Sequence, residues 1–84
     1  FLLPGFVDVH CHPFIVDSPT QSYQLAHLLD SGPYKTLRAL KRVQEYLQAG
    51  WTSIRIAGDA EVGFGVLDLQ RAVNEGMFMG PRIQ

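Results

Sequence analysis

The order of strand-like and helix-like segments constrains the fold of this chain more than any other feature. Residues 6–10 and 51–57 are apolar and rich in β-branched or aromatic side chains, which favour strands. Residues 33–49 and 66–74 show helical spacing, and residues 82–84 resemble the beginning of a third strand. This alternation is typical of parallel strands joined by right-handed crossovers. We therefore predict an α/β fold in which other parts of a protein cover the sheet.

The 33–49 segment is the clearest helix. Its apolar residues recur at spacings of three and four and predict one packing stripe, made of Leu37, Leu40, Val43 and Leu47. Charged residues mostly occupy the other faces: Lys35, Arg38, Lys41, Arg42 and Glu45. Gly50 fits the position that follows a helix C-terminus. In the second helix the candidate packing residues are Leu67, Leu69, Ala72 and Val73.

Two loops separate these elements. Ser18 and Pro19 resemble a helix N-cap followed by proline at the first helical position, and residues 21–29 predict a short helix. The loop at 58–65 is rich in glycine, but it lacks the lysine and hydroxyl of a phosphate-binding loop. Turn flexibility is therefore the favoured interpretation of that loop.

Composition limits the possible functions. With 84 residues the chain forms one small domain at most, and 46% hydrophobic residues suit a packed segment. A net charge of −1 without a basic block argues against nucleic-acid or anionic-membrane binding. One cysteine excludes an internal disulfide. Because the chain begins with Phe1, we expect a segment of a longer protein, and a cytoplasmic location is the default expectation.

The residues around the first strand suggest metal chemistry. If residues 6–12 are extended, alternate side chains share a face. One face then carries a carboxylate and two imidazoles, Asp8, His10 and His12. The other is apolar and suited to packing, with Val7, Val9 and Cys11, of which the cysteine is expected to be a small buried residue. Neutral imidazole is a common zinc ligand, so this strip suggests a metal site. From these residues alone, hydrogen-bonded structural histidines are the alternative interpretation.

Three segments in order resemble the amidohydrolase superfamily, in its imidazolonepropionase-like and Xaa-Pro dipeptidase (prolidase)-like branch. They are Pro-Gly-Phe-Val-Asp-Val-His-Cys-His at 4–12, Ala-Gly-Trp-Thr-Ser-Ile-Arg at 49–55 and Asn-Glu-Gly-Met-Phe-Met-Gly-Pro-Arg-Ile at 74–83. The resemblance implies a TIM-type (β/α)₈ barrel with a metal-dependent hydrolase site at its C-terminal mouth. Residues 1–84 would span strand 1 to the start of strand 3, without a second domain. One departure is Ile56, where the family often has an acidic residue.

The resemblance also implies roles for individual residues. His10 and His12 would be metal ligands, and the remaining ligands, a lysine, two histidines and an aspartate, would lie on later strands. Asp8 is either a group that supports the ligands or an acceptor for backbone amides. His27 is expected at or near the surface, and Arg55 either forms a salt bridge in the barrel or faces the helices. The aromatic residues expected to pack between barrel and helices are Trp51, Phe64 and Phe78.

Two functional hypotheses emerge from these residues. In the first, the parent protein hydrolyses an amide, peptide or cyclic amide C–N bond with a metal-activated water, and the isolated chain is inactive. Its cofactor would be one or two divalent ions, zinc by default, and its substrate a small amide or dipeptide-like molecule. In the second, the chain is non-catalytic and at most binds metal weakly or associates with itself or with the missing barrel portion.

Overall fold

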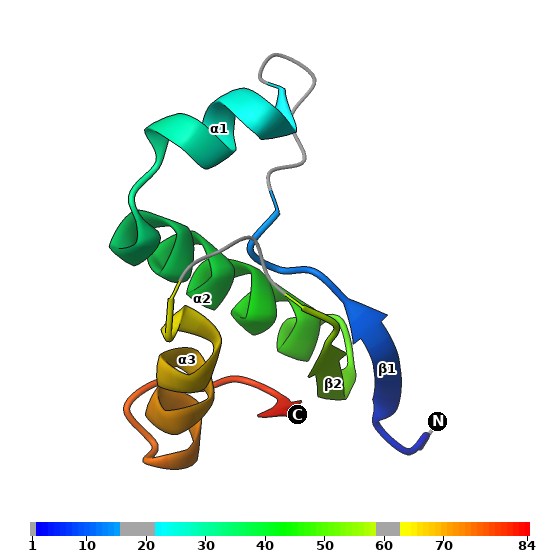
Figure 1. The fold of residues 1–84 in the computed structure, drawn as a ribbon. Helices are drawn as coiled ribbons and strands as arrows, with labels where there is room; N and C mark the ends of the chain where they lie inside the picture. Colours follow the sequence, from blue (N-terminus) through cyan, green and yellow to red (C-terminus); the bar gives the residue numbers. More distant parts are fainter. Residues whose placement is uncertain (1, 16–21, 59–62) are drawn as a thin grey trace.

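A computed structural model of the chain describes residues 2–15, 22–58 and 63–84. The predicted alternation of strands and helices is confirmed, with boundaries that differ by at most two residues. Ser18 and Pro19 lie outside the described residues. The elements in chain order are β1 (Phe6–Cys11), α1 (Tyr23–Leu29), α2 (Gly32–Gln48), β2 (Trp51–Ile56), α3 (Gly65–Asn74) and β3 (Arg82–Ile83) (Figure 1).

Local sequence signals explain where the first two helices begin and where the second ends. The Ser22 hydroxyl accepts from the Leu25 amide at 3.1 Å, and the Ser31 hydroxyl accepts from the Tyr34 amide at 3.2 Å. Both serines are therefore N-caps. Gly50 has a φ of 102°, which is the left-handed backbone expected just after a helix. The chain can thus turn directly from α2 into β2.

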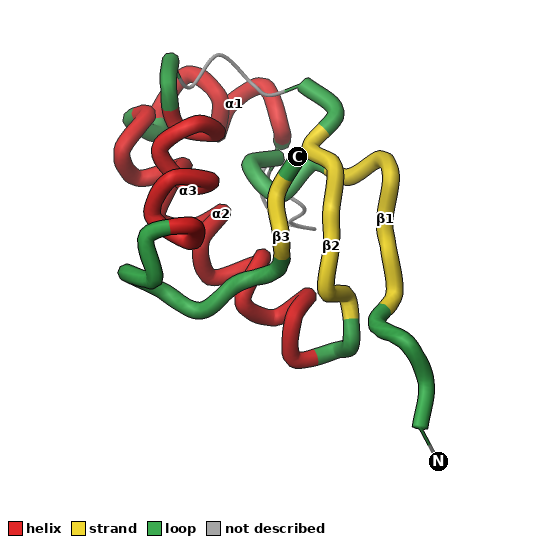
Figure 2. The backbone as a smooth tube through the Cα atoms, turned by 90° about the horizontal axis from the view of Figure 1, so that it is seen from below, coloured by secondary structure: helices red, strands yellow, loops and turns green. Residues whose placement is uncertain are grey.

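The three strands form a parallel sheet in the order β1-β2-β3. Figure 2 shows the strands side by side, with α2 and α3 on one side of the sheet. The molecule measures 43 × 29 × 18 Å, and the short dimension reflects this sheet-and-helix arrangement of two layers. The described strands form an open sheet, and closure into a barrel is not part of this structure.

One apolar core lies between the sheet and the helices. Its buried residues are Cys11, Phe14, Ala39, Val43, Ile54, Leu69 and Ile83. Trp51 packs against this core from its edge and contacts Phe6, with ring centroids 5.4 Å apart. The expected packing role is confirmed for Trp51, but Phe64 is 74% exposed and Phe78 is 42% exposed, so the prediction is wrong for these two.

The apolar stripe of α2 is divided between two neighbours. The buried residues of α2 are Lys35, Ala39 and Val43. Leu37, which was predicted to pack, is 64% exposed. Leu40 packs against the core, as predicted, and with Leu37 it also lines a groove of about 400 Å³ between α2 and α3.

The packing prediction for α3 is also correct only in part. Leu69 is buried and Val73 packs against the core, but Leu67 is 59% exposed. A ten-residue helix on the margin of a three-stranded sheet turns one narrow face to the core. Among the described helices, none combines the length and apolar character needed to cross a bilayer.

Candidate functional site

The strand β1 does not keep a regular alternation along its length. Asp8 pairs with Ile54 and Cys11 pairs with Ile56, so three steps on β1 correspond to two steps on β2. This irregularity resembles a β-bulge, which inserts one extra residue and reverses the facing of the residues after it. Since Ile54 and Ile56 share a face, Asp8 lies on the same face as Cys11. The prediction that Asp8 shares a face with the two histidines is therefore wrong.

The predicted apolar face of β1 is also divided. Cys11 is 7% exposed, and its thiol contacts the Arg55 carbonyl oxygen at 3.4 Å, which confirms its role as a small buried residue. Val7 and Val9, however, are 62% and 68% exposed. They line a hollow on the sheet with Ser53, Arg55, Arg82 and Gln84, among others. The prediction that Val7, Val9 and Cys11 share one face is therefore wrong, because the irregularity between Asp8 and Cys11 separates the cysteine from the two valines.

His10 and His12 approach each other at the C-terminal end of β1. Their Nε2 atoms lie 3.1 Å apart, and the two rings meet edge to face with centroids 5.0 Å apart. Both residues are exposed, so a ligand from outside can reach them. Two nitrogens held by one zinc ion at about 2.0–2.1 Å in tetrahedral geometry lie a little over 3 Å apart. The pair thus fits two positions around one ion.

The Asp8 carboxylate supports the backbone beside this pair. Its Oδ1 accepts from the backbone amide of His10 at 3.0 Å. Asp8 also lies near Tyr46 of α2. Burial raises the pKa of the Tyr46 hydroxyl, the nearby Cys11 and Asp8 raise it further, and Arg42 lowers it. Asp8 therefore contacts the main chain of His10, which is one of the two roles that the sequence left open.

Two histidines are an incomplete ligand set. In the ranges 2–15, 22–58 and 63–84, no cluster of three or more histidine, cysteine, aspartate or glutamate residues could hold a metal ion. Structural zinc usually takes four protein ligands and catalytic zinc three. The arrangement can therefore supply part of a metal site, and further ligands must come from elsewhere.

Other candidate residues lie apart from the histidine pair. His27 is half-buried on α1, as expected, where its carbonyl oxygen accepts from Lys35 Nζ at 3.0 Å. Arg55 is exposed on the open face of the sheet and does not face the helices. Gly58 and Gly63 have φ values of 79° and 63°, which agree with the turn interpretation of that loop.

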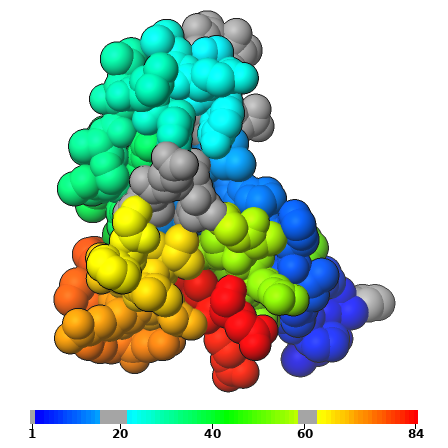
Figure 3. All heavy atoms as spheres, viewed as in Figure 1, coloured from blue at the N-terminus to red at the C-terminus, as the bar shows by residue number. Residues whose placement is uncertain are grey.

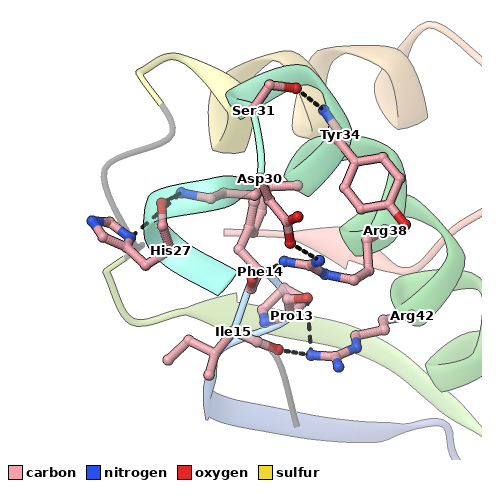
Figure 4. A network of polar contacts seen from close by, with 10 residues as sticks. Pro13, Phe14, Ile15, His27, Asp30, Ser31, Tyr34, Arg38 and Arg42 are labelled. Carbon is pink, nitrogen blue, oxygen red and sulfur yellow. Dashed lines mark hydrogen bonds and ion pairs between the residues drawn. The ribbon is translucent and has the colours of Figure 1, made fainter. Parts of the chain in front are cut away.

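A group of cations on α2 was not singled out from the sequence. Lys35, Arg38 and Arg42 follow one another at spacings of three and four. Lys35 Nζ donates to the His27 carbonyl oxygen of α1, and Arg38 and Arg42 point toward Asp30 and the segment after β1 (Figure 4). Arg38 Nη1 forms an ion pair with Asp30 Oδ2 at 2.7 Å. In the sequence, the spacing of three and four already places these cations on one face of the helix. Pro13, which has no backbone N–H, marks the place where the preceding segment leaves the strand.

The strand that carries the candidate pair lies at the margin of the molecule. Figure 3 shows the first segment of the chain, in blue, along one margin of the molecule. That position agrees with the strand order, in which β1 is an outer strand of the described sheet. The face and edge of β1 are therefore accessible to further strands or to another molecule.

Two solved structures contain a segment similar to this chain. A crystal structure of an uncharacterized protein matches with a TM-score of 0.71 and 30% identity, over 95% of this chain and 18% of that chain. A crystal structure of a prolidase complexed with N-methylphosphonate-L-proline matches with a TM-score of 0.71 and 28% identity, over 95% of this chain and 17% of that chain.

The chain thus spans less than a fifth of the length of the two solved structures. No protein-family model matches it, and no curated protein is similar to it. The structural likeness nevertheless supports the resemblance noted in the sequence. The chain has the fold of a segment of a prolidase-like, amidohydrolase-like protein.

Proposed function

We propose that this chain supplies two metal ligands, His10 and His12, to a hydrolase that cleaves an amide or peptide C–N bond. The observation that carries the proposal is the 3.1 Å approach of the two Nε2 atoms at the end of β1. In (β/α)₈ enzymes, catalytic groups gather at the C-terminal ends of the strands. The likeness to a prolidase favours a small amide or dipeptide-like substrate.

The chain's own residues would prepare the site in two ways. His10 and His12 would each present a neutral Nε2 toward one ion, zinc by default, although imidazole also suits other transition metals. Asp8 would hold the backbone of His10 through its amide. When bound, a divalent ion supplies a water of lowered pKa and polarises a carbonyl oxygen.

The proposal assigns the rest of the site to later strands of a barrel. By the resemblance, these strands would carry a lysine, two further histidines and an aspartate. We expect no hydrolase turnover from the 84-residue chain alone, because the described residues offer two ligands and lack a third.

A second candidate function is non-catalytic self-association, with at most weak metal binding. The observation that favours it is the exposure of Val7 and Val9 on the open face of an outer strand. Unpaired strand edges and exposed apolar surface promote pairing between chains. Both candidates rest on residues of β1, and they differ in the protein around this strand.

Calorimetric titration with Co²⁺ or Zn²⁺ tests the ligand pair in the chain itself. We expect weak binding that is lost in His10→Ala and in His12→Ala, because each variant leaves one imidazole. His27→Ala is the matched control and should bind like the unmodified chain, since His27 lies on α1. Binding that survives both substitutions at the pair would contradict the ligand assignment.

Turnover tests the enzymatic part of the proposal. A longer protein that contains these segments should hydrolyse a dipeptide with C-terminal proline and lose at least about tenfold in rate in His12→Ala. Normal turnover and metal content in that variant would contradict the proposal. Absence of any metal-dependent turnover, together with concentration-dependent association of the chain, would favour the second candidate.

A further inference from the structure

The chain leaves the sheet directly after the histidine pair, and its backbone then needs new hydrogen-bond partners. Pro13 and Phe14 are both fully buried, although neither belongs to a strand or helix. Buried peptide carbonyls that lack a donor destabilise a fold by about 1–3 kcal/mol each. The carbonyl oxygens of Pro13 and Phe14 must therefore be satisfied from outside the sheet.

Two arginines on α2 provide these donors, as Figure 4 shows. Arg42 Nη1 donates to the carbonyl oxygen of Pro13 at 3.3 Å and also to that of Ile15. Arg38 Nη2 donates to the carbonyl oxygen of Phe14 at 3.4 Å. Three consecutive carbonyls thus accept from two guanidinium groups that lie one helical turn apart.

Arg38 is itself fixed by a second contact. Its Nη1 bonds to Asp30 Oδ2 at 2.7 Å, and the two side chains are 21% and 20% exposed. A partly buried, charge-assisted hydrogen bond of this length holds the guanidinium more firmly than an exposed pair would. The arginines therefore act as fixed donors, and their planar geometry suits several carbonyl acceptors at once.

One further hydrogen bond connects the segment held by the two arginines to the histidine pair. The Ile15 amide donates to the carbonyl oxygen of His12 at 3.2 Å and closes a turn. His12 lies just beyond the end of β1, and the last bond to the neighbouring strand runs from the Ala57 amide to the Cys11 carbonyl oxygen at 3.1 Å, on the N-terminal side of His12. On its C-terminal side the backbone of His12 is held by the turn, whose far end the two arginines bind.

We propose that Arg42, assisted by Arg38, is a positioning residue that brings His12 Nε2 to its 3.1 Å approach to His10. The inference rests on the proposed function, in which the two histidines bind one metal ion. Arg42 touches neither the imidazoles nor a substrate, and it acts through the backbone of the turn. Through these arginines, the position of α2 on the sheet influences the distance between the two imidazoles.

The test compares Arg42→Met with Arg71→Met in the 84-residue chain. Methionine keeps the apolar stem of arginine but removes its donors. Arg71 is a suitable control because it forms an exposed ion pair with Glu75 on α3. Two quantities are measured: the Kd for Co²⁺ by calorimetry, and the hydrogen-exchange rate of the Ile15 amide by NMR in metal-free chain.

In Arg42→Met we expect the Kd for Co²⁺ to rise about tenfold and the Ile15 amide to exchange several-fold faster. Arg71→Met should change neither quantity, and Arg42→Lys should give intermediate values because one donor group remains. An unchanged Ile15 exchange rate in folded Arg42→Met would overturn the inference, as would an unchanged Kd in a chain whose binding needs His12.

The two proposals fail in different ways. If the unmodified chain binds no Co²⁺, the ligand pair of the proposed function fails, while the exchange rate of Ile15 still decides whether Arg42 holds the turn. If Arg42→Met does not fold, Arg42→Lys and Arg38→Met provide the same comparison, and a normal Ile15 exchange rate in both would overturn the inference.

Discussion

The two faces of the sheet differ in what covers them. On the helical side, Ile54 and Ile83 are 2% and 4% exposed and pack against Val43 of α2. On the opposite side, Val7 and Val9 are more than half exposed and share a hollow with two arginines. A parallel sheet is normally covered on both faces. The contrast indicates that one face is complete within this chain, and that the other is suited to contact with further protein.

The largest effect should come from a charge placed on the closed face. Val43 is fully buried, so Val43→Asp would place a carboxylate among apolar groups and should cost more than about 4 kcal/mol, enough to abolish folding. Val9→Asp is the matched control on the open face and should leave the helices intact. Circular dichroism and urea unfolding measure both; equal losses would remove the difference between the faces.

A smaller effect is expected when the core residue after β1 is truncated. Phe14 is 1% exposed, and Phe14→Ala should lower the free energy of unfolding by about 3–5 kcal/mol through lost burial and a cavity. Phe64 is 74% exposed, so Phe64→Ala should change stability by less than about 0.5 kcal/mol. Urea unfolding compares the two variants, and a similar cost for both would contradict the assignment of the core.

The smallest expected effect concerns pH at the closed face. Burial raises the pKa of Tyr46 above the ordinary value of about 10, so the folded chain holds this proton more tightly than the unfolded chain. The resulting stabilisation is fully present below about pH 10 and is lost as the pH rises through the raised pKa.

Tyr46→Phe should therefore weaken the loss of stability above about pH 10, as measured by urea unfolding between about pH 8 and 11. Tyr34→Phe serves as the control, because Tyr34 is 56% exposed. If the free energy of unfolding changes with pH in the same way in both variants, burial of Tyr46 against the sheet does not explain that change.

Local signals in the sequence were sufficient for the elements and for the identity of the two candidate ligands. Helical spacing, serine caps and Gly50 predict α2 and its ends, because these features act through bonds between near neighbours. The His-Cys-His unit marks the candidate site for the same reason, since residues two apart on an extended chain share a face.

The tertiary structure decided which face each side chain takes. The irregular register of β1 against β2 places Cys11 on the same face as Asp8 and separates it from Val7 and Val9, and no local pattern specifies that register. Likewise, the spacing of Arg38 and Arg42 shows that they share a helix face, but their backbone acceptors lie 24 to 29 residues away along the chain. Contacts of this range depend on how the helix docks on the sheet. The sequence alone thus determined which residues could bind a metal, and packing decided how they are held.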